Sequence, residues 1–191
     1  MTMNFVELTA AVGKWSQRNF GDQDGLNEIA PFLGMIEELQ DEAPAAKTLE
    51  QVKDAYADTV IFFADFCYRA GIPVAILEVI STDLDCCSLT VLPSDRPHLS
   101  RITGRLTHIL LKRRQRIRGQ GKLLAENTEA VTRILQFACS LRVAYQYAEY
   151  VHSSLDDVLE PCTPSLLEVA VNVWETTVSK RDWTRNKEKG V

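Results

Sequence analysis

The sequence has few cysteines, and none of them are paired at a metal-binding spacing. The five cysteines form no Cys-x-x-Cys motif, and their number is odd. Neither a disulfide framework nor a structural zinc site is therefore expected. We predict reduced thiols in a cytoplasmic protein.

Long apolar runs are also absent. The longest, residues 59–67, is interrupted by Asp65 and is too short to cross a bilayer. The first residues lack the basic start and the apolar run of a signal peptide. The sequence thus predicts neither a membrane partner nor a targeting segment.

Sustained apolar alternation, the mark of a β-strand, is missing as well. Apolar residues recur instead every three or four positions, which predicts helices at residues 4–19, 26–42, 48–70, 73–80, 100–117, 123–151 and 165–183. Pro44 is expected to end the second helix, Thr48 to cap the third, and Gly71 to end it. Residues 81–97 are expected to form a loop. The predicted fold class is all-α, a helical bundle in a single domain of 191 residues.

The charge of the chain is low on average but unevenly distributed. The net charge of −5 argues weakly against a general nucleic-acid binder. Residues 22–65 hold eleven acids and two lysines, whereas residues 101–122 hold eight cations and no acid. The single domain 1–191 is therefore expected to have an acidic, metal-binding part at residues 1–84 and a basic helical part at residues 98–191.

Helical spacing gathers acidic residues on one face of the second and of the third predicted helix. They are Glu37, Glu38 and Asp41 on the second helix, and Asp54, Asp58 and Asp65 on the third. Those of the third helix align within about 40°. Because the connection between the two helices is short, the helices are predicted to be antiparallel neighbours.

Asp58 is the acid that most needs a partner, because an apolar run follows it directly. Burying a carboxylate there is costly, and like charges four residues apart destabilise a helix. A hard cation would remove both penalties, and oxygen ligands without nearby His or Cys favour Mg²⁺ or Mn²⁺. The absence of a Glu-x-x-His pair argues against a di-iron bundle. The alternative is a solvated acidic face.

Two blocks of the sequence resemble a known enzyme family. Residues 32–41 resemble the Glu-Glu-x-x-Glu block of MazG-like nucleoside triphosphate pyrophosphohydrolases, and residues 52–60 resemble their second acidic block. The resemblance covers residues 5–72. It implies an all-α NTP pyrophosphatase bundle, usually oligomeric, here with a helical C-terminal extension. It also implies magnesium-dependent cleavage of a nucleoside triphosphate to the monophosphate and pyrophosphate.

The resemblance also implies site residues. The acids that fall on the family motif are Glu37, Glu38, Asp41 and Asp58. All four are predicted metal ligands, and one of the adjoining glutamates is the predicted proton acceptor. Asp41 stands where Glu is usual, and Ala55 stands where many members have Glu. Asp54, which still faces Asp58, is a candidate replacement ligand.

Candidate substrate contacts lie outside the acidic blocks. They are Asn19 near the N-terminus, Lys112, Arg116 and Arg118 in the basic segment, and Lys180 and Arg181 near the C-terminus. The basic segment also suits a solvated helix, a subunit contact or a nucleic-acid surface. Nucleic acid is the less expected partner, because the segment has no interleaved aromatic residues for base stacking.

Relatives of this kind pair their bundles, so a homodimer or a larger homo-oligomer is expected. Leu135, Ala138, Leu141 and Tyr145 are the predicted contact face. Two other functions remain open: a non-catalytic helical interaction protein with a degenerate acidic bundle, supported by Ala55, and a nucleic-acid-associated module using residues 101–122.

Overall fold

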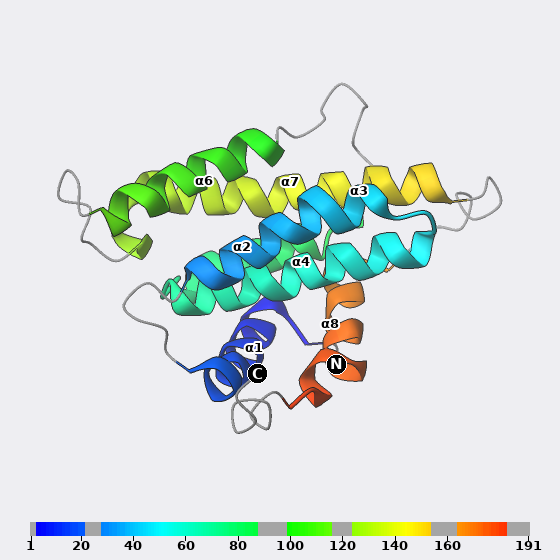
Figure 1. Cartoon of the computed structure of the whole chain (residues 1–191), viewed down its shortest axis with the longest axis horizontal. Helices are drawn as coiled ribbons and strands as arrows, with labels where there is room; N and C mark the ends of the chain where they lie inside the picture. The colour runs from blue at the N-terminus through cyan, green and yellow to red at the C-terminus, as the bar shows by residue number, and fades with distance from the viewer. Residues whose placement is uncertain (1–2, 22–27, 88–98, 116–123, 154–163, 183–191) are drawn as a thin grey trace.

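The computed structural model describes residues 3–21, 28–87, 99–115, 124–153 and 164–182 (Figure 1). Its α-helices are α1 (Phe5–Phe20), α2 (Ile29–Glu37), α3 (Ala43–Ala45), α4 (Leu49–Arg69), α5 (Val74–Leu84), α6 (Leu99–Arg114), α7 (Thr128–His152) and α8 (Leu166–Thr176). A π-helical turn η1 (Glu38–Glu42) and 3₁₀ turns η4 (Leu124–Glu126) and η6 (Val178–Lys180) complete the set. No strand occurs in these ranges, and the all-α prediction is confirmed.

The ends of α4 follow the predicted chemistry. The Thr48 hydroxyl accepts a hydrogen bond from the Gln51 amide and caps the first turn. At the other end, Gly71 adopts a φ of 65°, and the Ile72 amide reaches back to the Cys67 carbonyl over 3.0 Å. This is the Schellman arrangement, in which glycine avoids the steric cost of a left-handed residue.

Other helix ends differ from the prediction. The fourth helix, predicted to stop at residue 80, continues to Leu84, because Leu84 lies four positions after Ile80 and both are fully buried. The helix predicted from residue 123 begins at Thr128. The Asn127 side chain caps it by accepting hydrogen bonds from the Glu129 and Ala130 amides. The last helix ends at Thr176 and is followed by the separate turn η6.

The prediction that Pro44 ends the second helix is wrong. The helix continues through η1 into α3, and Pro44 lies in the first turn of α3. In the widened turn the Ala43 amide bonds to the Glu38 carbonyl, five residues back. A proline ring clashes with the carbonyl four residues earlier in a regular α-helix. The π turn directly before Pro44 relaxes that geometry.

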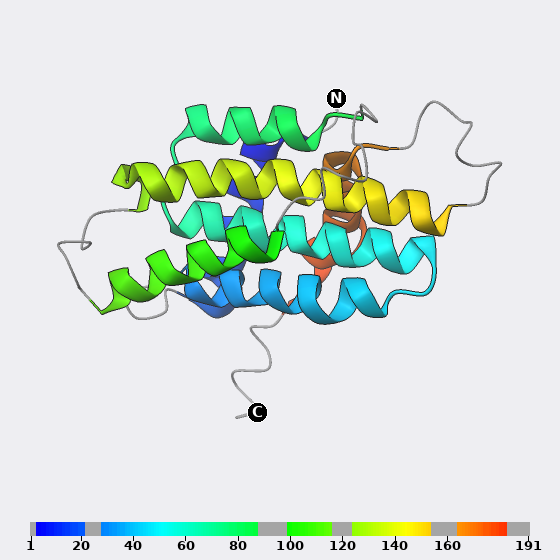
Figure 2. The ribbon, with the colours of Figure 1, turned by 90° about the horizontal axis from the view of Figure 1, so that it is seen from above.

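The helices form three tiers with α4 at the centre (Figures 1 and 2). Helices α6 and α7 lie in the upper tier of Figure 1, α2, α4 and α5 in the middle, and α1 and α8 below. Helix α4 packs against α1, α2, α7 and α8. A helix with neighbours on all sides needs apolar residues around its whole circumference. This packing explains the apolar run at residues 59–67, which is nearly all buried.

A glycine sets the distance between α2 and α4. A Cβ atom added at Gly34 would lie 2.6 Å from Cε1 of the Phe62 ring, so the two antiparallel helices approach closely there. Glu38 follows Gly34 by one helical turn, and Asp58 precedes Phe62 by one turn. The Gly34–Phe62 contact therefore fixes the register that brings Glu38 towards Asp58.

Replacing Gly34 by Ala is expected to destabilise the protein by about 1–3 kcal/mol, because the added methyl group must displace the Phe62 ring. Urea unfolding followed by circular dichroism measures this. Gly104→Ala is the matched control, since a Cβ at Gly104 meets nothing within 4 Å and alanine is the better helix former. Equal stability of the two variants would contradict the close contact.

The prediction that α7 carries a subunit-contact face is wrong for three of its four residues. Ala138, Leu141 and Tyr145 are at most 1% exposed and belong to the core of this chain, while Leu135 packs partly buried against it. Helices α4, α5 and α6 all pack against α7. The apolar stripe thus serves folding within one chain, and it offers no surface for a second one.

No helix in the described part of the chain is long and apolar enough to cross a membrane.

Candidate functional site

The π turn η1 determines how the first acidic block is presented. Leu39 is buried and holds the turn on α4, while Glu38 beside it is half-buried. Glu37 and Asp41 are exposed. π turns inside α-helices are frequent at functional sites, because the extra residue re-aims the side chains around it. The turn was not predicted from the sequence.

The second acidic block lies on the facing part of α4. Asp58 is half-buried and Asp54 is exposed. Ala55, at the position where many MazG-like proteins have Glu, is buried. Its carbonyl accepts the Thr59 hydroxyl over 2.8 Å. The block therefore presents two carboxylates one turn apart, and Ala55 faces the core instead of the acids.

Glu38 and Asp58 interact across the two helices. Burial, followed by the charge of Asp58, raises the pKa of Glu38 to about 7, with Glu42, Glu37 and Asp54 adding to the effect. Burial and the charge of Asp54 raise the pKa of Asp58 to about 6. Two half-buried carboxylates from different helices thus share one environment, as the sequence predicted for the acids on these faces.

These raised pKa values predict how stability depends on pH. The folded protein holds protons on Glu38 and Asp58 that the unfolded chain releases. The contribution of Glu38 to stability is therefore fully present below its ordinary pKa of 4.5 and is lost as the pH rises through about 7. For Asp58 the corresponding pKa values are 3.8 and about 6. After a discount for solvent screening the loss is about 1 kcal/mol, or about 2–4 °C in Tm.

Thermal unfolding with a chelator at about pH 5 and pH 8 tests this sign. The Glu38→Gln/Asp58→Asn double variant is the control, because it removes both titrations and leaves the rest of the chain unchanged. A pH dependence of Tm that is the same in the parent and in the double variant would exclude the assignment to this pair.

Arg181 is brought to the same place by the C-terminal packing. Helix α8 lies against α4, and Arg181 follows η6. The indole Nε1 of Trp15 donates to the Arg181 carbonyl over 3.1 Å. The Arg181 guanidinium lowers the pKa of Asp58, opposing the rise caused by burial. A cation 123 residues away in the sequence is thus part of the acidic environment.

The other two candidate substrate contacts near the chain ends, Lys180 and Asn19, differ in exposure. Lys180 is exposed at the end of η6. Asn19 is 1% exposed, and its amide donates to the Trp15 carbonyl over 2.9 Å. Trp15 is half-buried and has edge-on contacts with Phe20 and Trp174. In this conformation Asn19 supports α1, and its side chain is closed to solvent.

The described end of the basic segment, at the end of α6, meets α2 at the start of α2. Lys112 lies near the end of α6, where the neighbouring Arg113 forms an ion pair with Glu28 at the start of α2. Ten residues of helix, about 15 Å, separate Glu28 from Glu38. Arg116 and Arg118 lie outside the described residues. Glu28 is 2% exposed, so this ion pair is largely buried on the Glu28 side.

Asp65 does not extend the acidic site, although it shares a helical face with Asp58. It lies two turns further along α4, where its carboxylate accepts the Ser16 hydroxyl over 2.6 Å and the Arg69 guanidinium over 2.9 Å. Arg69 also donates to Ser16 and to the Gly21 carbonyl. This buried network ties α4 to the end of α1 and leaves no free carboxylate.

Another buried carboxylate, Glu149, was missed by the sequence reasoning. Glu149 on α7 is 6% exposed, accepts the Tyr145 hydroxyl over 3.0 Å and lies 3.7 Å from the Lys53 ammonium. Burial and the charge of Glu149 raise the pKa of Tyr145. The four-residue spacing between Tyr145 and Glu149, within the apolar stripe of α7, was the sequence signal for this contact.

The predicted metal site depends on how the potential ligands are grouped in the fold. Within the described ranges, no three His, Cys, Asp or Glu side chains are grouped so that they could hold a metal ion. A closed protein cage is therefore not formed there. The Glu38–Asp58 pair suits a more open kind of Mg²⁺ site. In phosphate-transfer sites the ion is often held by one or two carboxylates together with substrate phosphates and water.

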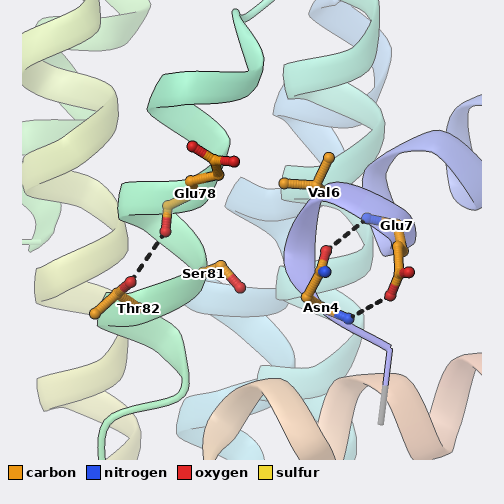
Figure 3. Close-up of a pocket in the computed structure, with 6 residues that line it drawn as sticks. All are labelled: Asn4, Val6, Glu7, Glu78, Ser81 and Thr82. Carbon is orange, nitrogen blue, oxygen red and sulfur yellow. Dashed lines mark hydrogen bonds between the residues drawn. The ribbon is translucent and has the colours of Figure 1, made fainter. Parts of the chain in front are cut away.

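An open hollow lies between the start of α1 and α5, and none of the predicted site residues lines it (Figure 3). Its lining residues are Asn4, Val6, Glu7, Glu78, Ser81 and Thr82. Asn4 and Glu7 form a reciprocal capping box, and Ser81 accepts the Phe5 amide over 3.1 Å. Because these polar groups serve helix α1, we assign no ligand to the hollow.

No protein-family model, curated protein or solved structure matches the chain.

Proposed function

We propose that this chain is a magnesium-dependent nucleoside triphosphate pyrophosphohydrolase, and that Glu38 and Asp58 form the centre of its site. The observation that carries the proposal is that these two half-buried carboxylates lie on facing helices, where burial raises the pKa of both and the charge of Asp58 further raises the pKa of Glu38. Such perturbed acids are typical of functional sites. The resemblance of residues 5–72 to MazG-like proteins gives the reaction class.

The charge of the site explains why a cation is part of the proposal. A triphosphate is a polyanion, and the acidic pair alone would repel it. Glu38 and Asp58 would hold Mg²⁺, with Asp54 and Asp41 as exposed acids of the same two blocks. When bound, the ion polarises phosphoryl oxygens and lowers the pKa of water. Mn²⁺ would suit the same oxygen ligands.

The residues of the chain then have separate roles. Glu37 is exposed next to Glu38, so it is the proposed acceptor of the proton from the attacking water. Arg181, whose charge already reaches Asp58, is the proposed contact to a substrate phosphate. Lys180 is close enough in sequence to assist, and Lys112 would need a substrate that extends along α2.

The test is pyrophosphate release from a panel of ribo- and deoxynucleoside triphosphates, with Mg²⁺ and with a chelator. Release of pyrophosphate and monophosphate from at least one substrate, only with the metal, is the expected result. Release of single phosphate groups, or activity unaffected by the chelator, would exclude this reaction. The cytoplasmic location and the homo-oligomer remain expectations, and light scattering tests the second.

One observation favours a second candidate, a non-catalytic helical interaction protein. Ala55 is buried and supplies no ligand, and no three of the described acids are arranged so that they could hold a metal ion. This candidate predicts no turnover of any triphosphate in the panel. It also predicts that Glu38 and Asp58 can be neutralised without loss of binding to a partner.

A further inference from the structure

Helix α6 is an outer element of the bundle (Figures 1 and 2). It packs mainly on α7. The buried side of α6 consists of Thr103, Leu106, Ile109 and Leu110. Among the described elements, none other covers much of the helix, so its opposite side faces outward.

A row of basic residues occupies that outward side. The row, here called the basic stripe, consists of Arg101, Arg105, His108 and Lys112. Their spacing of four, three and four positions places them within about 60° of one another on the helix. The first three are exposed and Lys112 is half-buried. The stripe is straight and about 16 Å long, at 1.5 Å per residue.

The charges of the stripe are not neutralised within the described part of the chain. The one ion pair of α6 found there joins Arg113 to Glu28, and Arg113 points to a different side of the helix. Helix α6 itself contains no acid. In a chain of net charge −5, a row of cations that form no ion pair with the described residues leaves a local positive surface on an outer helix, available to a polyanion.

We propose that the basic stripe binds the phosphate backbone of a nucleic-acid duplex. A 16 Å row spans about five base pairs at 3.4 Å each, so its three Arg and Lys side chains can contact phosphates along one strand. Such contacts position a protein on a duplex without reading its sequence. The stripe belongs to α6, whereas the acidic pair belongs to η1 and α4, and this inference does not depend on the hydrolase proposal.

The double strand is favoured over a single strand by composition. Helix α6 contains no Phe, Tyr or Trp, and single-strand binders stack unpaired bases on such rings. Backbone contacts need no aromatic residues, and an exposed row of cations is a local exception to the negative net charge of the chain.

Fluorescence anisotropy of a labelled duplex of about 20 base pairs tests the proposal in the full chain without magnesium. With three phosphate contacts, the slope of log K against log salt should be about −2.7 between about 50 and 200 mM KCl. The Arg101→Gln/Arg105→Gln variant should lose about two units of that slope and bind about tenfold more weakly. The control, Lys14→Gln/Lys47→Gln, removes the same charge from exposed lysines elsewhere and should retain the slope.

Three results would overturn the proposal. One is an unchanged salt slope in the Arg101→Gln/Arg105→Gln variant when circular dichroism shows it to be folded. Another is equal or tighter binding of the single strand alone. The third is polyglutamate competing as effectively as duplex at equal charge, which would identify an acidic protein surface as the partner.

Discussion

Glu38→Gln and Asp58→Asn are each expected to reduce magnesium-dependent pyrophosphate release by about 10²–10³-fold while helical content stays unchanged. Each substitution removes a charged oxygen that the proposed ion needs, and electrostatic contributions of this kind are worth several kcal/mol in a transition state. Steady-state assays of kcat/KM, paired with far-ultraviolet circular dichroism, measure the effect.

The same substitutions should stabilise the protein without metal at about pH 8. The charge of Asp58 raises the pKa of Glu38, and that of Asp54 raises the pKa of Asp58, so these carboxylates repel one another when ionised; a neutral amide at either position removes part of that repulsion. Loss of activity together with a gain in Tm distinguishes a functional site from a structural one. Damage to the fold would lower both quantities.

Glu50→Gln is the matched control for these two variants. Glu50 lies in the first turn of α4 and is exposed, so its substitution removes one negative charge from the same helix. It should leave kcat/KM within about threefold, as expected of weak surface electrostatics. Turnover near that of the parent in both Glu38→Gln and Asp58→Asn would exclude the assigned site.

The largest stability effect is expected from Asp65→Ala, at about 3–5 kcal/mol. This change leaves the Arg69 guanidinium buried with its main ionic partner removed, and an unpaired buried charge is strongly destabilising. The Ser16 hydroxyl loses its acceptor as well. Urea unfolding gives the free energy, which should fall without a change in the m-value.

Two companion variants sharpen this experiment. Asp54→Ala removes an exposed aspartate from the same helix and should change stability by about 0.5 kcal/mol or less. Asp65→Leu/Arg69→Met replaces the ion pair by apolar side chains and should regain much of the loss. If Asp65→Ala and Asp54→Ala were equally mild, the buried network would not be important for stability.

The sequence by itself determined the local structure. The three- and four-residue apolar spacing gave most helices, because each amphipathic helix must bury one face. The Thr48 cap and the Gly71 end of α4 followed from chemistry confined to a few neighbouring residues. The same periodicity placed Glu38 and Asp58 on facing sides of two antiparallel helices.

Only the tertiary structure decided which residues with similar spacing share an environment. Asp65 aligns with Asp58 in sequence, but its neighbours are Ser16 and Arg69, because α1 crosses α4 at that level. Arg181 reaches Asp58 because α8 folds back on α4, a long-range contact that no local pattern encodes. The apolar stripe of α7 was predicted as a subunit contact and instead packs within the chain. Periodicity shows that a face must be buried, whereas the partner that buries it depends on how the whole chain folds.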